Sequence, residues 1–171
     1  IRDYKVTGGS DVCSSDLKHC ISSFTTFLYN LFKMIILGID PGIATTGYGF
    51  VEKNGNKLKM VDYGAVCTPA KKDLSFRLHL LHTDLIALLH TYRPTHVAVE
   101  SLFFNTNVKT AITVAHARGV ILFTLQSMQL PIATYTPLQI KSSVSGYGRA
   151  TKSQVQYMVK KLLNLTQTPK P

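Results

Sequence analysis

Two acidic residues stand at the ends of apolar segments, where their carboxylates could do chemistry. Asp40 follows the apolar run 35–39, and Glu100 follows the run 97–99. Short, continuous apolar runs are typical of strands that are buried on both faces. In open α/β sheets, ligands bind beyond the carboxyl ends of such strands. If the two strands are neighbours, their carboxylates converge and could hold Mg²⁺ or Mn²⁺, which prefer oxygen ligands.

Two divalent ions held at such a place could stabilise both the attacking and the leaving oxygen of a phosphodiester. A structural role is the alternative for Asp40, in which the carboxylate caps the turn formed by Pro41 and Gly42. Glu100 favours the metal hypothesis, because residues 34–171 contain only six acidic side chains. We therefore predict one site to which Asp40 and Glu100 both contribute.

The hydrophobic pattern predicts the elements that would position these two residues. Strands are expected at 35–39, 47–51, 57–66, 97–99 and 131–135, with helices at 74–92, 108–128 and 152–163. Asn54-Gly55 predicts a hairpin turn, and Thr151 with Gln154 has the form of a capping box. Three strands followed by alternating helices and strands predict an α/β fold, a mixed five-stranded sheet flanked by helices.

Residues 1–33 do not share the pattern of the following segment. They are rich in Ser and Thr and show no clear hydrophobic period. The run Val-Cys-Ser-Ser-Asp-Leu at 12–17 resembles the translation of a sequencing-library adapter. We expect residues 1–17 to be an assembly artefact, 18–33 to be translated upstream sequence, and Met34 to be the natural start. The predicted folded domain therefore comprises residues 34–171.

Charge is distributed unevenly along the chain. Residues 101–171 contain eight lysines and arginines and no aspartate or glutamate, within a chain whose net charge is +10. Such a basic region attracts polyanions, although it could also be merely solvated or balanced by an acidic segment elsewhere. The three cysteines suggest neither a disulfide framework nor a zinc site, and we expect reduced thiols in a cytoplasmic protein. No apolar run predicts a membrane span.

Four motifs in order resemble those of the RuvC family of Holliday-junction resolvases. The resemblance runs from Met34 to about Pro169, and the motifs are quite specific when taken together. They are Ile-Leu-Gly-Ile-Asp-Pro-Gly at 36–42 with Thr-Gly-Tyr-Gly at 46–49, Val-Glu-Ser-Leu-Phe at 99–103 with Asn107, His-Ala-Arg-Gly-Val at 116–120, and Val-Ser-Gly-Tyr-Gly at 144–148 with Ala-Thr-Lys-Ser-Gln-Val at 150–155.

The resemblance implies an RNase H-like fold and a Mg²⁺-dependent DNA endonuclease, with Mn²⁺ as a plausible substitute. It implies a homodimer that nicks four-way junction DNA symmetrically in recombination and repair, in the cytoplasm, together with branch-migration motor proteins. Asp40 and Glu100 match the first two of four catalytic acids, which hold two ions per site in the intact parent. The other two belong to an Asp-x-x-Asp-Ala segment that would follow the last residue here. We therefore expect negligible cleavage by residues 34–171.

The resemblance also suggests residues that contact DNA. Phe103 matches a phenylalanine that stacks on the bases of the junction, although a phenylalanine after a buried strand could belong to the core. Lys141 and Lys152 match basic positions of the family that bear on DNA binding and catalysis. Glycines allow close backbone approach, and a helix N-terminus offers free N–H groups to phosphates. The residues predicted to bind DNA are Phe103, Lys141, Gly146, Gly148, Arg149 and Lys152.

Several alternatives are compatible with the sequence. Ala111, Ala115 and Gly119 form a row of small residues that could face a second subunit or the sheet. A half of an actin-like or sugar-kinase ATPase shares the opening strand and turn, but about 138 residues cannot hold its two lobes. A junction-binding protein without catalysis and another RNase H-like nuclease also remain. Cleavage assays that compare four-way junctions with duplex DNA and RNA–DNA hybrids would distinguish among them.

Overall fold

The computed structural model describes residues 34–102 and 108–168. Its elements in chain order are β1 (Met34–Asp40), β2 (Thr45–Asn54), β3 (Lys57–Cys67), α2 (Leu74–Tyr92), β4 (His96–Glu100), α3 (Val108–Ser127), β5 (Ile132–Tyr135), α4 (Pro137–Ser145) and α5 (Lys152–Leu162). None of the helices in these two ranges is sufficiently long and apolar to cross a bilayer.

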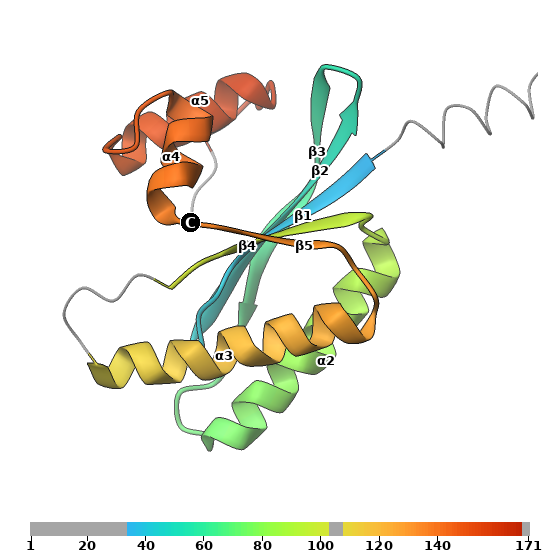
Figure 1. The fold of residues 1–171 in the computed structure, drawn as a ribbon, viewed down its shortest axis with the longest axis vertical. Coiled ribbons are helices and arrows are strands. Elements are labelled where there is room, and N and C mark those ends of the chain that lie inside the picture. The colour runs from blue at the N-terminus through green and yellow to red at the C-terminus, as the bar shows by residue number, and fades with distance from the viewer. Residues whose placement is uncertain (1–33, 103–107, 169–171) are drawn as a thin grey trace, which may run out of the picture. The chain divides into compact units, whose positions relative to one another are not determined.

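The five strands form one mixed sheet with the order β3-β2-β1-β4-β5 (Figure 1). The first three strands are joined antiparallel in sequence order, whereas β4 and β5 extend the sheet in parallel to β1. β2 and β3 are joined by the predicted hairpin, in which Gly55 takes the left-handed conformation (φ 57°) that glycine tolerates best. The predicted mixed five-stranded sheet is confirmed.

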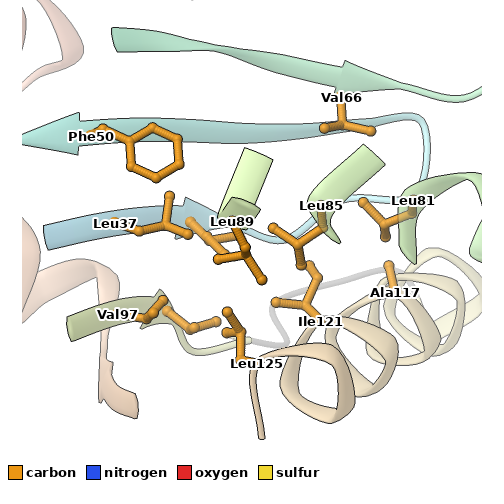
Figure 2. Close-up of a cluster of buried hydrophobic side chains, with 12 residues drawn as sticks. Leu37, Phe50, Val66, Leu81, Leu85, Leu89, Val97, Ala117, Ile121 and Leu125 are labelled. Atoms are coloured by element: carbon orange, nitrogen blue, oxygen red, sulfur yellow. The ribbon is translucent and has the colours of Figure 1, made fainter. Parts of the chain in front are cut away.

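One face of the sheet carries the hydrophobic core, which it forms with α2 and α3. Leu37, Phe50 and Val97 point from the strands toward these helices, and Leu85 on α2 and Ile121 on α3 meet them (Figure 2). All five side chains are buried. The alternation of side chains along a strand explains why β1 is apolar throughout, because its other residues face the opposite layer.

The opposite face of the sheet lies toward α4 and α5 (Figure 1). An apolar groove of about 480 Å³ separates them, with Ile36 and Gly38 on the β1 side and Val144 and Val159 on the helical side. Even-numbered residues of β1 therefore face this second layer. Asp40 continues that series and consequently belongs to the same face.

Helix α4 was not among the elements that the sequence predicted. Thr136 caps it by accepting a hydrogen bond from the backbone N–H of Gln139, and the Gln139 side chain accepts one from the Thr136 backbone N–H. Pro137 occupies the first turn, where its missing N–H costs nothing. This capping box has the same Thr-x-x-Gln form as the one at Thr151, which the sequence predicted and the structure confirms.

Candidate metal centre and nucleic-acid interface

Asp40 and Glu100 end two strands that lie side by side. β1 and β4 pair in parallel, and the last pair in the register joins Ile39 to Val99. Each acid is the next residue along its strand. Because Ile39 and Val99 are both buried in the core, the side chains that follow them project from the opposite face. The two carboxylates are therefore neighbours on one face, at one edge of the sheet.

Both acids line a cavity of about 830 Å³ at this edge. Gly47, which has no side chain, and Ala98, which has only a methyl group, line it on the strand side, while Tyr135 and Ile140 contribute from β5 and α4. The cavity is thus bounded by the strand ends and by the helix that the sequence did not predict. Its size suits a small group such as a phosphate with its ions.

The two carboxylates influence each other electrostatically. Partial burial raises the pKa of Asp40 above its ordinary value, although the residue as a whole remains exposed. Burial also raises the pKa of Glu100, and the negative charge of Asp40 raises it further. The positive charge of Lys141 opposes this shift in the pKa of Glu100. Two like charges held close together form a site to which a cation would bind favourably.

The turn after Asp40 is held by threonines. The Thr46 hydroxyl donates to the Gly42 carbonyl at 2.5 Å, and the Thr68 hydroxyl donates to the Ile43 carbonyl. A Cβ on Gly42 would lie 2.2 Å from the Thr45 carbonyl oxygen, so only glycine fits there. The hydrogen bonds that shape this turn thus come from Thr46 and Thr68, which leaves the Asp40 carboxylate available for another role.

The residues predicted to bind DNA on α4, on α5 and between them lie in two separate regions. Lys141 lies on α4 near enough to Glu100 to influence its pKa, which joins it to the carboxylate pair. Gly146 ends α4 in the left-handed conformation, and Lys152 begins α5 behind the Thr151 cap. Arg149 lies exposed between the two helices. Among the described residues, the lining of the Asp40–Glu100 cavity includes none of these last three.

Two further predictions concern Gly148 and Phe103. A Cβ on Gly148 would lie 3.3 Å from the Leu138 carbonyl oxygen of α4, a tight contact that would need a small shift of the neighbouring atoms. The absence of a side chain at Gly148 lets the loop pack closely against α4, and its predicted contact with DNA stays a prediction. Phe103 lies outside the described residues, and its predicted contact with DNA stays a prediction.

A network of two tyrosines and an aspartate was not predicted. The Tyr92 hydroxyl at the end of α2 donates to the Asp62 carboxylate at 2.7 Å, and the Tyr48 hydroxyl donates to the same oxygen at 3.5 Å. Tyr48 also lines the cavity with Asp40. The Asp62 carboxylate raises the pKa of the Tyr92 hydroxyl, chiefly through this hydrogen bond. Such pairing joins residues far apart in sequence, so periodicity does not reveal it.

Within the ranges 34–102 and 108–168, no cluster of three or more His, Cys, Asp or Glu side chains could hold a metal ion. A pair of carboxylates nevertheless fits Mg²⁺, which is commonly bound by one or two carboxylates and keeps several waters or substrate phosphate oxygens as its other ligands. The donor set of Asp40 and Glu100 is consistent with a hard divalent cation, and it contains no soft ligand that would favour zinc or copper.

Comparison with known proteins identifies the family. The family model described as crossover junction endodeoxyribonuclease RuvC matches residues 36–171. The chain belongs to the RuvC family. Family proteins of this name from Halothermothrix orenii and Heliobacterium modesticaldum are each 56% identical to it over 138 residues. These residues cover 81% of this chain and 84% or 85% of the respective relative.

Solved structures agree with this assignment to the RuvC family. Thermus thermophilus RuvC in complex with a Holliday junction substrate superposes with a TM-score of 0.75 at 34% identity, covering 81% of this chain and 84% of that one. The yeast mitochondrial resolvase Ydc2 shares the fold, with a TM-score of 0.59 at 17% identity. The expected RNase H-like fold is confirmed. RuvC proteins are metal-dependent nucleases, which agrees with the chemistry of the carboxylate pair.

Replacing Asp40 by Asn should lower the pKa of Glu100, because the neighbouring negative charge disappears while the side chain keeps its size. Lys141→Met should raise the same pKa, since the opposing positive charge is lost. The carboxyl carbon shift of Glu100 in an NMR titration without divalent metal measures both effects. Asp84→Asn on α2 is the matched control and should leave this pKa unchanged. A Glu100 pKa that does not respond to Asp40→Asn would show that the carboxylates do not converge.

Proposed function

We propose that this protein is a structure-specific DNA endonuclease that resolves Holliday junctions by metal-dependent hydrolysis of phosphodiester bonds, with symmetric nicks, in recombination and repair. The observation that carries the proposal is the convergence of Asp40 and Glu100 at the ends of two parallel strands, in one cavity and with coupled charges. The RuvC structure bound to a Holliday junction substrate supports the choice of DNA.

In this proposal, Asp40 and Glu100 hold Mg²⁺, for which Mn²⁺ could substitute, with two ions per site in the intact enzyme. When bound, the ions supply Lewis acidity that stabilises charge on the oxygens of the scissile phosphate. Lys141 adds a positive charge beside Glu100 and would contact a non-bridging phosphate oxygen. The small residues Gly47 and Ala98 leave room for the DNA backbone at the cavity floor.

Arg149 and Lys152 would bind DNA phosphates at the start of α5, a second place on the same basic half of the chain. The first N–H groups of α5 point toward this end, and its dipole favours an anion there. Residues 101–171 contain no acidic side chain that would compete for these cations. Contacts of this kind position a nucleic acid without reading its sequence. A cytoplasmic location, where branch-migration motor proteins also act on junctions, is part of this proposal.

The 171-residue chain should bind a four-way junction more tightly than a duplex with the same arm sequences. Because the described residues bring only two carboxylates to the cavity, we expect binding to exceed cleavage by a wide margin. Fluorescence anisotropy with labelled junction, in Mg²⁺ and with excess unlabelled duplex or RNA–DNA hybrid, measures the preference.

Matched variants separate specific phosphate contacts from general charge in that experiment. Lys152→Gln should weaken junction binding and reduce the slope of log affinity against log salt concentration by about one. Lys71→Gln, in the loop before α2, removes the same charge elsewhere and should have little effect. Equal affinity for junction and duplex would refute the proposed function, whatever the variants do.

The proposal includes a homodimer. Two symmetric nicks require two active sites, and a twofold axis relates two such sites in a homodimer. The described surface of α3 offers a face for it. Ile112 and Phe123 on this helix are 55% and 69% exposed. Gly119 is also exposed, and a Cβ added there would meet no atom within 4 Å beyond its own helix backbone. The buried residues of α3, such as Ala117 and Ile121, face the core instead. The row of small residues therefore favours a partner over the sheet.

Gly119→Arg should convert the dimer into a folded monomer. An arginine fits in the isolated subunit, where the space is open, but it would prevent close approach of a second helix. Sedimentation equilibrium measures the mass, and circular dichroism with thermal unfolding checks that the fold is retained. Thr83→Arg, at an exposed position of α2, is the control and should remain dimeric. A Gly119→Arg variant that is still a dimer would place the interface elsewhere.

A further inference from the structure

A second, smaller pocket is lined by the end of α4, the loop that follows it and the first part of α5. Its volume is about 380 Å³, and its walls include Tyr147 from the connecting loop and Tyr157 from α5, with Ser153 and Gln154 at the helix start. It shares no lining residue with the cavity that contains Asp40 and Glu100. Its volume falls at the lower end of the range for small-ligand sites, roughly 300 to 1,000 Å³. One planar ring system is an occupant of suitable size.

Both tyrosines of this tyrosine pocket are unusually open for aromatic residues. Tyr147 is 59% exposed and Tyr157 is 57% exposed. Each offers a large apolar ring surface to water, together with a hydroxyl that can form hydrogen bonds. Exposed apolar surface gathered around a concavity marks binding sites rather than the bulk of a protein surface. Both rings therefore present apolar surface that a ligand can contact.

The backbone that presents the tyrosines is stiff. The Tyr147 carbonyl accepts a hydrogen bond from the Ala150 backbone N–H at 3.1 Å, and the Ser145 hydroxyl, which donates to the Lys141 carbonyl at 2.6 Å, lies 3.2 Å from the same oxygen. Tyr157 extends from a helix whose first turn is fixed by the capping box of Thr151 and Gln154. That capping box uses only the amide oxygen of Gln154, so its amide nitrogen can donate to a ligand. A preorganised pocket loses little conformational entropy on binding.

The charges around the tyrosine pocket indicate which aromatic ligand it takes. The Lys161 ammonium lies 5.6 Å from the centre of the Tyr157 ring, and Arg149 and Lys152 flank the pocket in sequence. Residues 101–171 contain no acidic residue. A ligand that fits both features has a flat ring attached to a chain of negative charges. Nucleobases in a DNA strand have that chemistry, whereas an aromatic side chain of a protein partner lacks the anionic chain.

We propose that the tyrosine pocket binds an unpaired nucleobase of the DNA, stacked on Tyr147 or Tyr157, while its phosphates contact Arg149 and Lys152. This inference rests on the proposed function in so far as DNA is the substrate. Stacking on aromatic side chains tolerates every base, because each base has a π-face. The pocket would thus be an additional binding site for opened or single-stranded DNA, separate from the carboxylates that would hold the metal ions for hydrolysis.

An abasic oligonucleotide tests the proposal, because it keeps the phosphates and removes the rings. The two labelled probes are a 12-residue oligodeoxythymidylate and its abasic counterpart of equal length and charge. The 171-residue chain should bind the thymidylate about tenfold more tightly. Tyr157→Ala and Tyr147→Ala should each reduce this ratio severalfold without changing the affinity for the abasic strand. Tyr157→Phe keeps the ring and should preserve the ratio.

Phe76→Ala is the matched control. Phe76 is 49% exposed on α2, and the ammonium of Lys72, in the loop before this helix, lies 5.7 Å from its ring centre, so the two form a lysine–aromatic pair like that of Lys161 and Tyr157. Its loss should leave both affinities unchanged. The inference is overturned if the wild-type chain binds both strands equally, or if the tyrosine variants weaken binding to both alike. A preserved preference for junction over duplex in that case would refute the tyrosine pocket alone, whereas loss of that preference would refute the proposed function.

Discussion

The parallel pairing of β1 and β4 is the constraint on which the rest depends. It sets Ile39 opposite Val99, buries both in the core and leaves the next residue of each strand, an acid, on the other face. The core against α2 and α3 holds this register, because a shift by one residue would exchange the buried and the outward sets. The chemistry at the sheet edge is thus a consequence of packing on the far side of the same strands.

Convergence of two carboxylates is costly for the fold. Burial raises the pKa of both groups, and the charge of Asp40 adds to the shift at Glu100. A carboxyl with a raised folded-state pKa binds protons more tightly in the folded state. Stability therefore falls as the pH rises from the unfolded-state pKa, about 4, through the raised folded values. A divalent cation would offset this repulsion, so the feature that weakens the apo protein also favours metal binding.

The two acids of the site could be predicted from the sequence, whereas the helix and the contacts that surround them could not. Asp40 and Glu100 were predictable because an acid after a buried strand is a local pattern, and the capping box at Thr151 is local too. Helix α4 was missed, although Thr136 and Gln139 form the same pattern, because its nine residues are fewer than the roughly 11 to 18 over which a helical period can be recognised. The pairing of Tyr92 with Asp62, and the position of Tyr147 and Tyr157 around one pocket, depend on the packing of separate elements, which no local pattern encodes.

Anomalous diffraction at the manganese edge from crystals of the chain grown with Mn²⁺ tests the central claim most directly. The account predicts a peak within roughly 2 to 2.5 Å of a carboxylate oxygen of Asp40 and of one of Glu100, since both ligate the same cation cluster. Manganese bound elsewhere, with neither carboxylate coordinated at saturating Mn²⁺, would contradict the assignment of this sheet edge as the metal centre.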